Sequence, residues 1–114
     1  MAKVEILDSL KEEILRKFKS ESKIIFKLMY ALGENPNKGK ELGNVGGVVI
    51  KEIRYKSFRF YFITDGYLLR IIDSSKLADL LIKFVRISDK KSQQKTINEI
   101  KKILLNFGFK GFND

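Results

Sequence analysis

The chain has 114 residues, 44% of them apolar, which is enough to bury the core of one domain and too short for two. It has no cysteine, which excludes disulfides and thiolate metal sites, and no histidine, so acid–base chemistry would need carboxylates, Lys, Arg or Tyr. Lys and Arg outnumber Asp and Glu by 23 to 14, and the net charge of +9 favours a polyanionic partner such as nucleic acid or an acidic protein.

The overall pattern predicts one domain over residues 1–114 and no membrane contact. No apolar run approaches the roughly 20 residues that a transmembrane helix needs. Residues 1–14 lack the long apolar segment and the small-residue cleavage site of a secretory signal. We therefore expect a cytoplasmic protein without a membrane partner.

The first third of the chain predicts a strand and two helices. Residues 3–7 alternate between apolar and polar side chains and predict a short strand. Apolar stripes then predict one helix over about residues 9–18 and a second that starts near Ser20 and stops at Gly33. Only about two residues separate these helices, so we expect an antiparallel helical hairpin. The stripes are Leu10, Ile14 and Phe18 in the first helix, and Ile24, Ile25, Leu28 and Leu32 in the second.

Residues 33–47 predict a loop, because they hold five of the eight glycines and the single proline. The glycines do not form a phosphate-binding P-loop, since no Gly-Lys-Ser/Thr sequence follows them. Flexibility is the expected role of this segment.

The middle of the chain predicts a β-meander. Residues 48–55 and 58–64 predict two strands joined by a short turn. The Asp-Gly pair in "TDG" at 64–66 favours a type I′ hairpin turn. Residues 67–72 would then form the next strand of the meander.

The last part of the chain predicts a strand and a helix. Residues 73–79 predict a connection or one helical turn, and the apolar run 80–87 a buried strand. A stripe of apolar residues predicts a helix over about 92–106, and the glycine–aromatic tail is expected to fold back on the core. The fold class is therefore α+β: an N-terminal helical hairpin packed on an antiparallel β-sheet, with a C-terminal helix. The second face of the sheet is expected to be free.

Cations alternate with apolar residues in the predicted strands. Alternate residues of a strand share a face. Because Phe58, Phe60 and Phe62 belong in the core under the helices, Arg59 and Tyr61 should stand on the free face. Arginine beside tyrosine on an open sheet face suits phosphate binding and base stacking, although a solvated strand residue is the ordinary interpretation of any one cation.

In the preceding strand, the same alternation places Arg54 beside Glu52 and Lys51 on the opposite face. An ordinary ion pair between Arg54 and Glu52 would satisfy both charges.

Four short segments together resemble the RelE/HigB family of type II toxins, within the RelE/ParE superfamily. "KEIR" at 51–54 and "FR" at 58–59 match the family's Tyr-Glu-Leu-Arg strand and the Tyr-Arg that opens the next strand. "FV" at 84–85 and "KK" at 90–91 match its later apolar strand and the basic loop before the last helix. The resemblance covers most of residues 3–106, including the helical hairpin. It implies a ribosome-dependent, metal-independent endoribonuclease that cleaves mRNA, uses no cofactor and is neutralised by a cognate acidic antitoxin.

The resemblance also implies a catalytic site. Arg59 matches the arginine that stabilises the scissile phosphate, Lys91 the basic residue of the final loop, and Arg54 a basic residue near the 2′-hydroxyl. That hydroxyl would attack the adjacent phosphate, and fixed cations would stabilise the charge that develops on the phosphate oxygens. The candidate RNA-binding residues are Lys51, Lys56, Tyr61, Arg86 and Lys90.

Three departures from the family pattern keep other functions open. Glu52 stands where a basic residue is common, Ile97 stands where some members have tyrosine, and the segment 68–79 lengthens one connection. One alternative is a non-catalytic module on the same scaffold, either a gyrase-type inhibitor or a basic nucleic-acid binder. Another is a subunit whose cations only hold an acidic partner.

Overall fold

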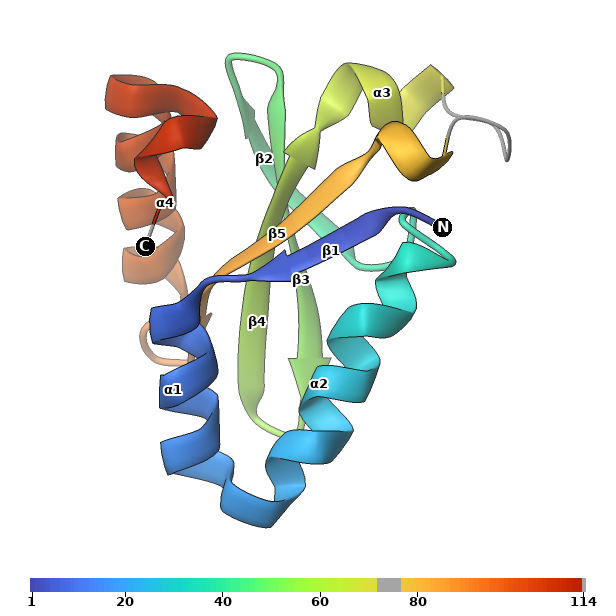
Figure 1. Ribbon diagram of the computed structural model, residues 1–114. Coiled ribbons are helices and arrows are strands. Elements are labelled where there is room, and N and C mark those ends of the chain that lie inside the picture. Colours follow the sequence, from blue (N-terminus) through green and yellow to red (C-terminus); the bar gives the residue numbers. More distant parts are fainter. Residues whose placement is uncertain (72–76, 114) are drawn as a thin grey trace.

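The computed structural model describes residues 1–71 and 77–113, which form a five-stranded sheet with helices on both sides (Figure 1). The strand order is β1-β5-β4-β3-β2. The α+β class is confirmed, but the sheet is mixed, because β1 pairs with β5 in parallel while the other three pairs are antiparallel. In chain order the elements are β1 (Lys3–Ile6), α1 (Asp8–Phe18), α2 (Ser22–Tyr30), β2 (Lys40–Val45), β3 (Val48–Tyr55), β4 (Phe58–Asp65), α3 (Gly66–Ile71), β5 (Leu81–Ser88) and α4 (Gln93–Phe107).

Helices α1 and α2 form the predicted hairpin and cover one face of the sheet. A short 3-10 turn, Lys19–Glu21, joins them, and they diverge like the arms of a V in Figure 1. Phe18, at the end of α1, packs edge-on against Phe58 with ring centroids 5.1 Å apart and also contacts Phe60. Phe60 is fully buried. The predicted placement of the phenylalanine face of β4 under the hairpin is therefore confirmed.

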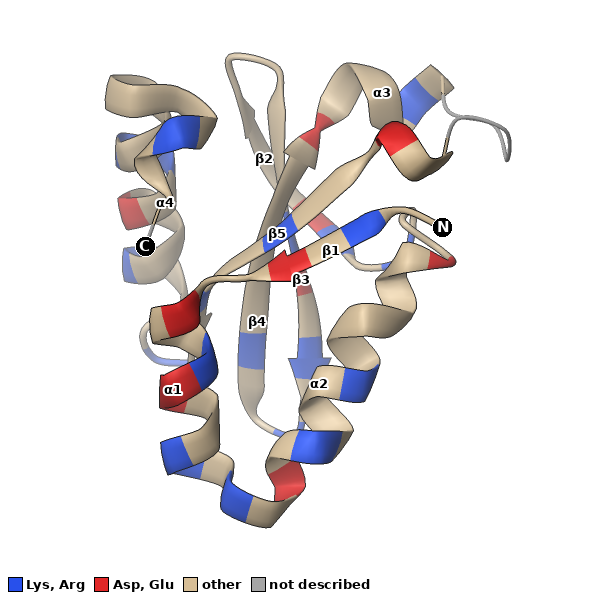
Figure 2. Cartoon of the chain, in the orientation of Figure 1, with Lys and Arg blue, Asp and Glu red and all other residues tan. Residues whose placement is uncertain are grey.

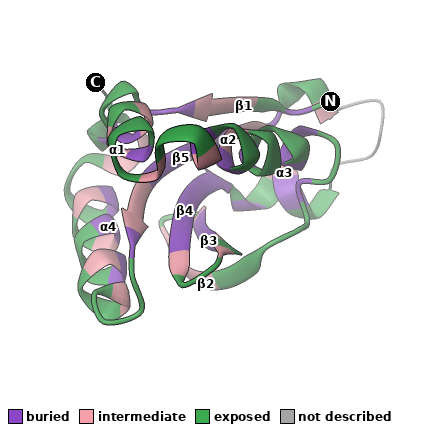
Figure 3. Cartoon of the chain, turned by 90° about the horizontal axis from the view of Figure 1, so that it is seen from below, coloured by how far each residue is buried: buried purple, intermediate pink, exposed green. Residues whose placement is uncertain are grey.

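Helix α4 covers the second face of the sheet, so the prediction of a free face is wrong. Seen from below in Figure 3, α1 and α2 lie on one side of the strands and α4 on the other. The stripe Ile97, Ile100 and Leu104 is buried, and α4 packs against β2 and β5. The hairpin already occupies the first face, so this apolar stripe can be buried only on the second.

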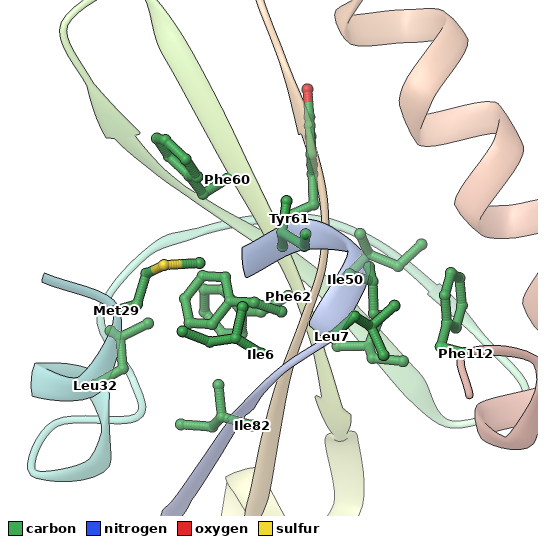
Figure 4. Close-up of a cluster of buried hydrophobic side chains, with 14 of the residues drawn as sticks. Ile6, Leu7, Met29, Leu32, Ile50, Phe60, Tyr61, Phe62, Ile82 and Phe112 are labelled. Atoms are coloured by element: carbon green, nitrogen blue, oxygen red, sulfur yellow. The ribbon is translucent and has the colours of Figure 1, made fainter. Parts of the chain in front are cut away.

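The core extends to both sides of β4, as the buried side chains in Figure 4 show. Phe62 lies with Met29 on the side of the hairpin, where its ring centroid is 5.0 Å from that of Phe84. Ile50 and Phe112 lie on the other side. Phe112 is buried, so the tail folds back on the core as predicted. No helix in the described part of the chain is long and apolar enough to cross a membrane.

The predicted loop 33–47 contains a strand, β2, which the sequence analysis missed. Val45 pairs with Val48, and the two residues between them, Gly46 and Gly47, have φ values of 58° and 87°. Two consecutive positive φ angles are what a two-residue hairpin turn requires, and glycine adopts them without strain. These glycines therefore form a tight turn and do not make a flexible loop.

The prediction of a strand over residues 67–72 is also wrong, because residues 66–71 form helix α3. Residue 72 lies outside the described residues. Oδ1 of Asp65 accepts a hydrogen bond from the backbone N–H of Leu68 at 2.9 Å, as an N-cap does. The N–H of Gly66 donates to the carbonyl of Gly47 at 2.8 Å. The Asp-Gly pair thus caps a helix where a hairpin turn was expected. In the predicted connection, 77–79 form a 3-10 turn, and 73–76 lie outside the described residues.

Candidate functional site

Arg54 and Arg59 face each other across β3 and β4. They are register partners in this antiparallel pair, one position from the strand ends that flank the turn. Figure 2 shows cationic positions side by side on these two strands. Like charges directly opposite each other on a sheet are destabilising, so a compensating anion is needed between them.

The carboxylate of Glu52 supplies this anion. Its Oε2 accepts a hydrogen bond from Nε of Arg54 at 3.1 Å and lies 3.9 Å from Nε of Arg59. Its Oε1 accepts a hydrogen bond at 3.1 Å from Nε2 of Gln93, the first residue of α4. Only 1% of the Glu52 side chain is exposed, so these partners replace water. We call Glu52, Arg54, Arg59 and Gln93 the Glu52 cluster; it joins β3, β4 and the start of α4.

The two arginines of the Glu52 cluster differ in exposure. The side chain of Arg54 is 53% exposed, and that of Arg59 only 7%. Nη1 of Arg59 donates to the carbonyl of Ser57 at 3.0 Å, while its Nε has no hydrogen-bond partner among the described residues. Arg59 therefore lies on the predicted face, opposite the hairpin, but is buried there. A ligand can reach Arg54 without any rearrangement of the chain.

Tyr61 is buried beside the Glu52 cluster and cannot stack on a base. Its hydroxyl lies 2.7 Å from Oγ of Ser88, and Ser88 itself donates to the carbonyl of Asp89 at 2.9 Å. Because the hydroxyl proton of Ser88 is donated to Asp89, the hydroxyl of Tyr61 must donate to Oγ of Ser88. Burial raises the pKa of Tyr61, which keeps the hydroxyl neutral. The pair links β4 to the end of β5.

Lys90 and Lys91 lie in the turn from β5 to α4, and both are exposed. The last residue of β5, Ser88, is the register partner of Arg59. The turn therefore begins at the end of the sheet that carries Arg54. The turn leads directly into Gln93, so it joins these two exposed lysines to the Glu52 cluster.

Asp89 organises the turn that carries the two lysines. Its Oδ1 accepts a hydrogen bond from the backbone N–H of Ser92 at 2.8 Å. This hydrogen bond to the ionised form is the main reason why the pKa of Asp89 is lowered. The negative charge also lies near the positive end of the α4 dipole, which is favourable.

Two of the predicted RNA-binding lysines lie away from the Glu52 cluster. Lys51 is buried on the hairpin side of the sheet, and its Nζ donates to the carbonyl of Asn37 at 2.8 Å. Burial lowers the pKa of this lysine. Lys56, in the turn between β3 and β4, is paired with Glu21. Neither lysine is available to a ligand at the cluster.

Arg86 lies on the face of the sheet that α4 covers, where α4 and the tail engage it. Its Nε is 2.7 Å from Oε1 of Glu99 on α4. Its guanidinium carbon lies 5.3 Å from the ring centroid of Phe112. These contacts are typical of a residue that holds the helix and the tail on the sheet.

Gln93 is the member of the Glu52 cluster that the sequence analysis missed. It opens a helix within the polar run "KSQQK", where glutamine is usually solvated. No local pattern indicates that its amide meets a carboxylate 41 positions away.

No family model, no curated protein and no solved structure matches the chain. What the protein does is therefore inferred from its own residues.

Proposed function

We propose that the protein is a RelE/HigB-like toxin that cleaves mRNA on the ribosome and is neutralised by an acidic antitoxin. The observation that carries this proposal is the Arg54–Arg59 pair at the end of the sheet from which the Lys90–Lys91 turn begins. Apart from the additional β1, β2 and α3, the order of elements agrees with it: a helical hairpin, two cation-bearing strands, an apolar strand, a basic turn and a last helix.

Arg54 is the residue best placed to contact a phosphate. Its Nε is held by Glu52, and its two terminal nitrogens have no hydrogen-bond partner among the described residues. A guanidinium fixed at one end presents its other nitrogens in a constant direction, which suits a bidentate contact with a phosphate. When the 2′-hydroxyl attacks, Arg54 would stabilise the charge on the phosphate oxygens. Lys91, on the exposed turn, would act as a mobile second charge.

Arg59 acts through Glu52 in this proposal. With 7% of its side chain exposed, it does not reach a phosphate in the present arrangement. The positive charge of Arg59 instead offsets the negative charge of Glu52. The Glu52 cluster then holds two positive charges and one negative charge. Without Arg59, the carboxylate would cancel the charge of Arg54 and reduce its attraction for a phosphate.

The test is cleavage of mRNA on programmed ribosomes. We expect Arg54→Ala to lower the cleavage rate by about 10²–10³, the usual loss for one preorganised donor. Arg16→Ala is the matched control, because it removes the same charge from an exposed arginine on α1 that belongs neither to the Glu52 cluster nor to the Lys90–Lys91 turn. A wild-type protein that cuts no mRNA on ribosomes would contradict the proposal.

The alternative is a non-catalytic module, either a gyrase-type inhibitor or a basic nucleic-acid binder. The observation that favours it is the burial of Arg59 and Glu52, which resembles a structural ion pair. If the wild type leaves mRNA intact while DNA supercoiling by gyrase falls, the gyrase inhibitor is the better description. If neither activity is found and overexpression is harmless, the binding module remains.

A further inference from the structure

A mostly apolar pocket of about 480 Å³ lies between α2 and the edge of the sheet at β3. Its apolar walls are Leu28 and Leu32, from α2 and the turn that follows it, and Ile53, from β3. Leu28 is 37% exposed, so the pocket leaves a large aliphatic side chain in contact with water. An aliphatic surface of this kind is stabilised when a partner covers it.

The pocket is open because β2 is shorter than β3. The pairing of β2 with β3 ends at Lys40, opposite Glu52. No described strand pairs with the outer edge of β3 beyond that point, along residues 53–55. Gly39, with a φ of 100°, brings the preceding loop against β3, where a Cβ would lie 3.0 Å from the Glu52 carbonyl oxygen. The loop thus forms one wall and leaves the rest uncovered.

The rim of the pocket is cationic. Lys38, Lys40 and Arg54 line it, and all three are exposed. Glu52 is the only acidic residue among the described residues of the lining, and its carboxylate is directed to Arg54, Arg59 and Gln93. Charge complementarity therefore favours an occupant with several carboxylates around an apolar group.

We propose that this pocket docks an acidic peptide segment of a protein partner, which inserts one large apolar side chain between Leu28 and Ile53. Its flanking carboxylates would lie against Lys38, Lys40 and Arg54. RNA fits the pocket less well, because its apolar walls are aliphatic and offer no aromatic ring on which a base could stack. In a toxin–antitoxin pair this segment would belong to the antitoxin, an identification that rests on the proposed function.

Docking at this pocket has a direct consequence for the Glu52 cluster. Arg54 belongs both to the rim and to the cluster, so an acidic occupant would take up the cluster's exposed guanidinium. A segment bound in the pocket would then prevent Arg54 from binding a phosphate, without displacing α4.

The experiment is a methyl NMR titration of the whole chain, labelled at Leu and Ile methyl groups. The probe is the peptide N-acetyl-Glu-Glu-Leu-Glu-Glu-amide, and the comparison peptide has Ala in place of Leu. We expect the methyl signals of Leu28, Leu32 and Ile53 to shift, and the Ala peptide to bind about tenfold more weakly, since the buried leucine is lost. Added salt should weaken the binding of both peptides. Unchanged methyl signals at millimolar peptide, or equal binding of the two peptides, would overturn the proposal.

Matched variants separate the pocket from the rest of α2. Leu28→Asp should abolish binding of the Leu peptide, while Ile24→Asp should change it by less than about twofold. Ile24 is a suitable control because it is 50% exposed one turn earlier and does not line the pocket. Both substitutions add the same charge, so equal losses would contradict the proposal.

A second variant guards against misfolding of Leu28→Asp. Lys38→Glu reverses the charge of an exposed rim residue. It should lower the affinity for the Leu peptide at low salt but not at high salt. A Lys38→Glu variant that binds as tightly as the wild type at low salt would refute the cationic rim. None of these measurements needs ribosomes, so a failure of peptide binding and a failure of mRNA cleavage can be told apart.

Discussion

Nε of Arg59 lies 3.9 Å from Oε2 of Glu52, the same oxygen that accepts a hydrogen bond from Arg54. One carboxylate thus serves two guanidinium groups, one buried and one exposed. The hydrogen bond to Glu52 orients the exposed guanidinium of Arg54. The buried guanidinium of Arg59 depends on the same carboxylate to compensate its charge.

Removing the charge of Glu52 should destabilise the protein. We expect Glu52→Gln to lower the free energy of unfolding by about 3–5 kcal/mol, because buried Arg59 then lacks a carboxylate partner. Glu99→Gln is the control, since Glu99 is 49% exposed in its pair with Arg86 and should cost less than about 1 kcal/mol. Urea unfolding of the three proteins measures both values, and equal costs would show that Glu52 is not an important compensating charge.

Removing the charge of Arg59 should weaken RNA binding as removal of Arg54 does. We expect Arg59→Gln to leave Glu52 free to cancel Arg54, so that one phosphate contact is lost. The slope of log affinity against log salt for single-stranded RNA should then fall by about 0.7, as for Arg54→Ala. Arg59→Lys should restore the slope, because it restores the charge. If Arg59→Gln lowers stability but leaves the slope unchanged, Arg59 has only a structural role.

Asp89 should make the stability of the fold depend on acid pH. Its pKa is lowered in the folded protein, so its contribution is present above its usual pKa of 3.8 and is lost as the pH falls toward the folded value. Asp89→Asn can still accept the hydrogen bond from Ser92 but does not titrate. We therefore expect the free energy of unfolding to fall more steeply below pH 3.8 in the wild type than in the variant. Parallel curves would exclude this role.

Gly66 should tolerate no side chain, although it lies in a helix. A Cβ there would lie 2.7 Å from Cγ2 of Val49 and 2.9 Å from the carbonyl oxygen of Gly47. We expect Gly66→Ala to cost about 1–3 kcal/mol by overpacking. Gly46→Asn is the control, because a Cβ at Gly46 meets nothing within 4 Å and asparagine tolerates its φ of 58°. Thermal unfolding compares the two, and a neutral Gly66→Ala would contradict the close approach.

The elements with a strong apolar stripe could be predicted from the sequence, and the contacts between distant segments could not. The helices α1, α2 and α4 and the strands β1, β3, β4 and β5 lie close to their expected positions, because each carries its own periodicity. Strand β2 has little apolar alternation and a register shift between Glu41 and Gly43, so it depends on its partner β3. It could not be recognised from its own residues.

The segment after β4 shows why local signals can be ambiguous. Asp-Gly suits both a hairpin turn and a helix start, and here Asp65 caps α3 while the N–H of Gly66 donates to the carbonyl of Gly47. This second contact comes from the turn between β2 and β3, which a local pattern does not specify.

The candidate site shows the same division. Alternation along the strands correctly placed Arg54 beside Glu52, and Arg59 on the face opposite the hairpin. Whether that face is open depends on where α4 docks, and this depends on contacts such as the one between Gln93 and Glu52. The sequence therefore predicted which charges gather and not which of them a ligand can reach.

The parallel pairing of β1 with β5 has a consequence for how the chain folds. Lys3 pairs with Leu81, so this edge of the sheet joins segments that lie far apart in the sequence. Closing so long a segment is entropically unfavourable, and pairings of this kind form late. During synthesis, β1 must wait unpaired until β5 has left the ribosome exit tunnel. A bulky fusion next to Lys3 would therefore slow the last step of folding more than one attached beyond the tail.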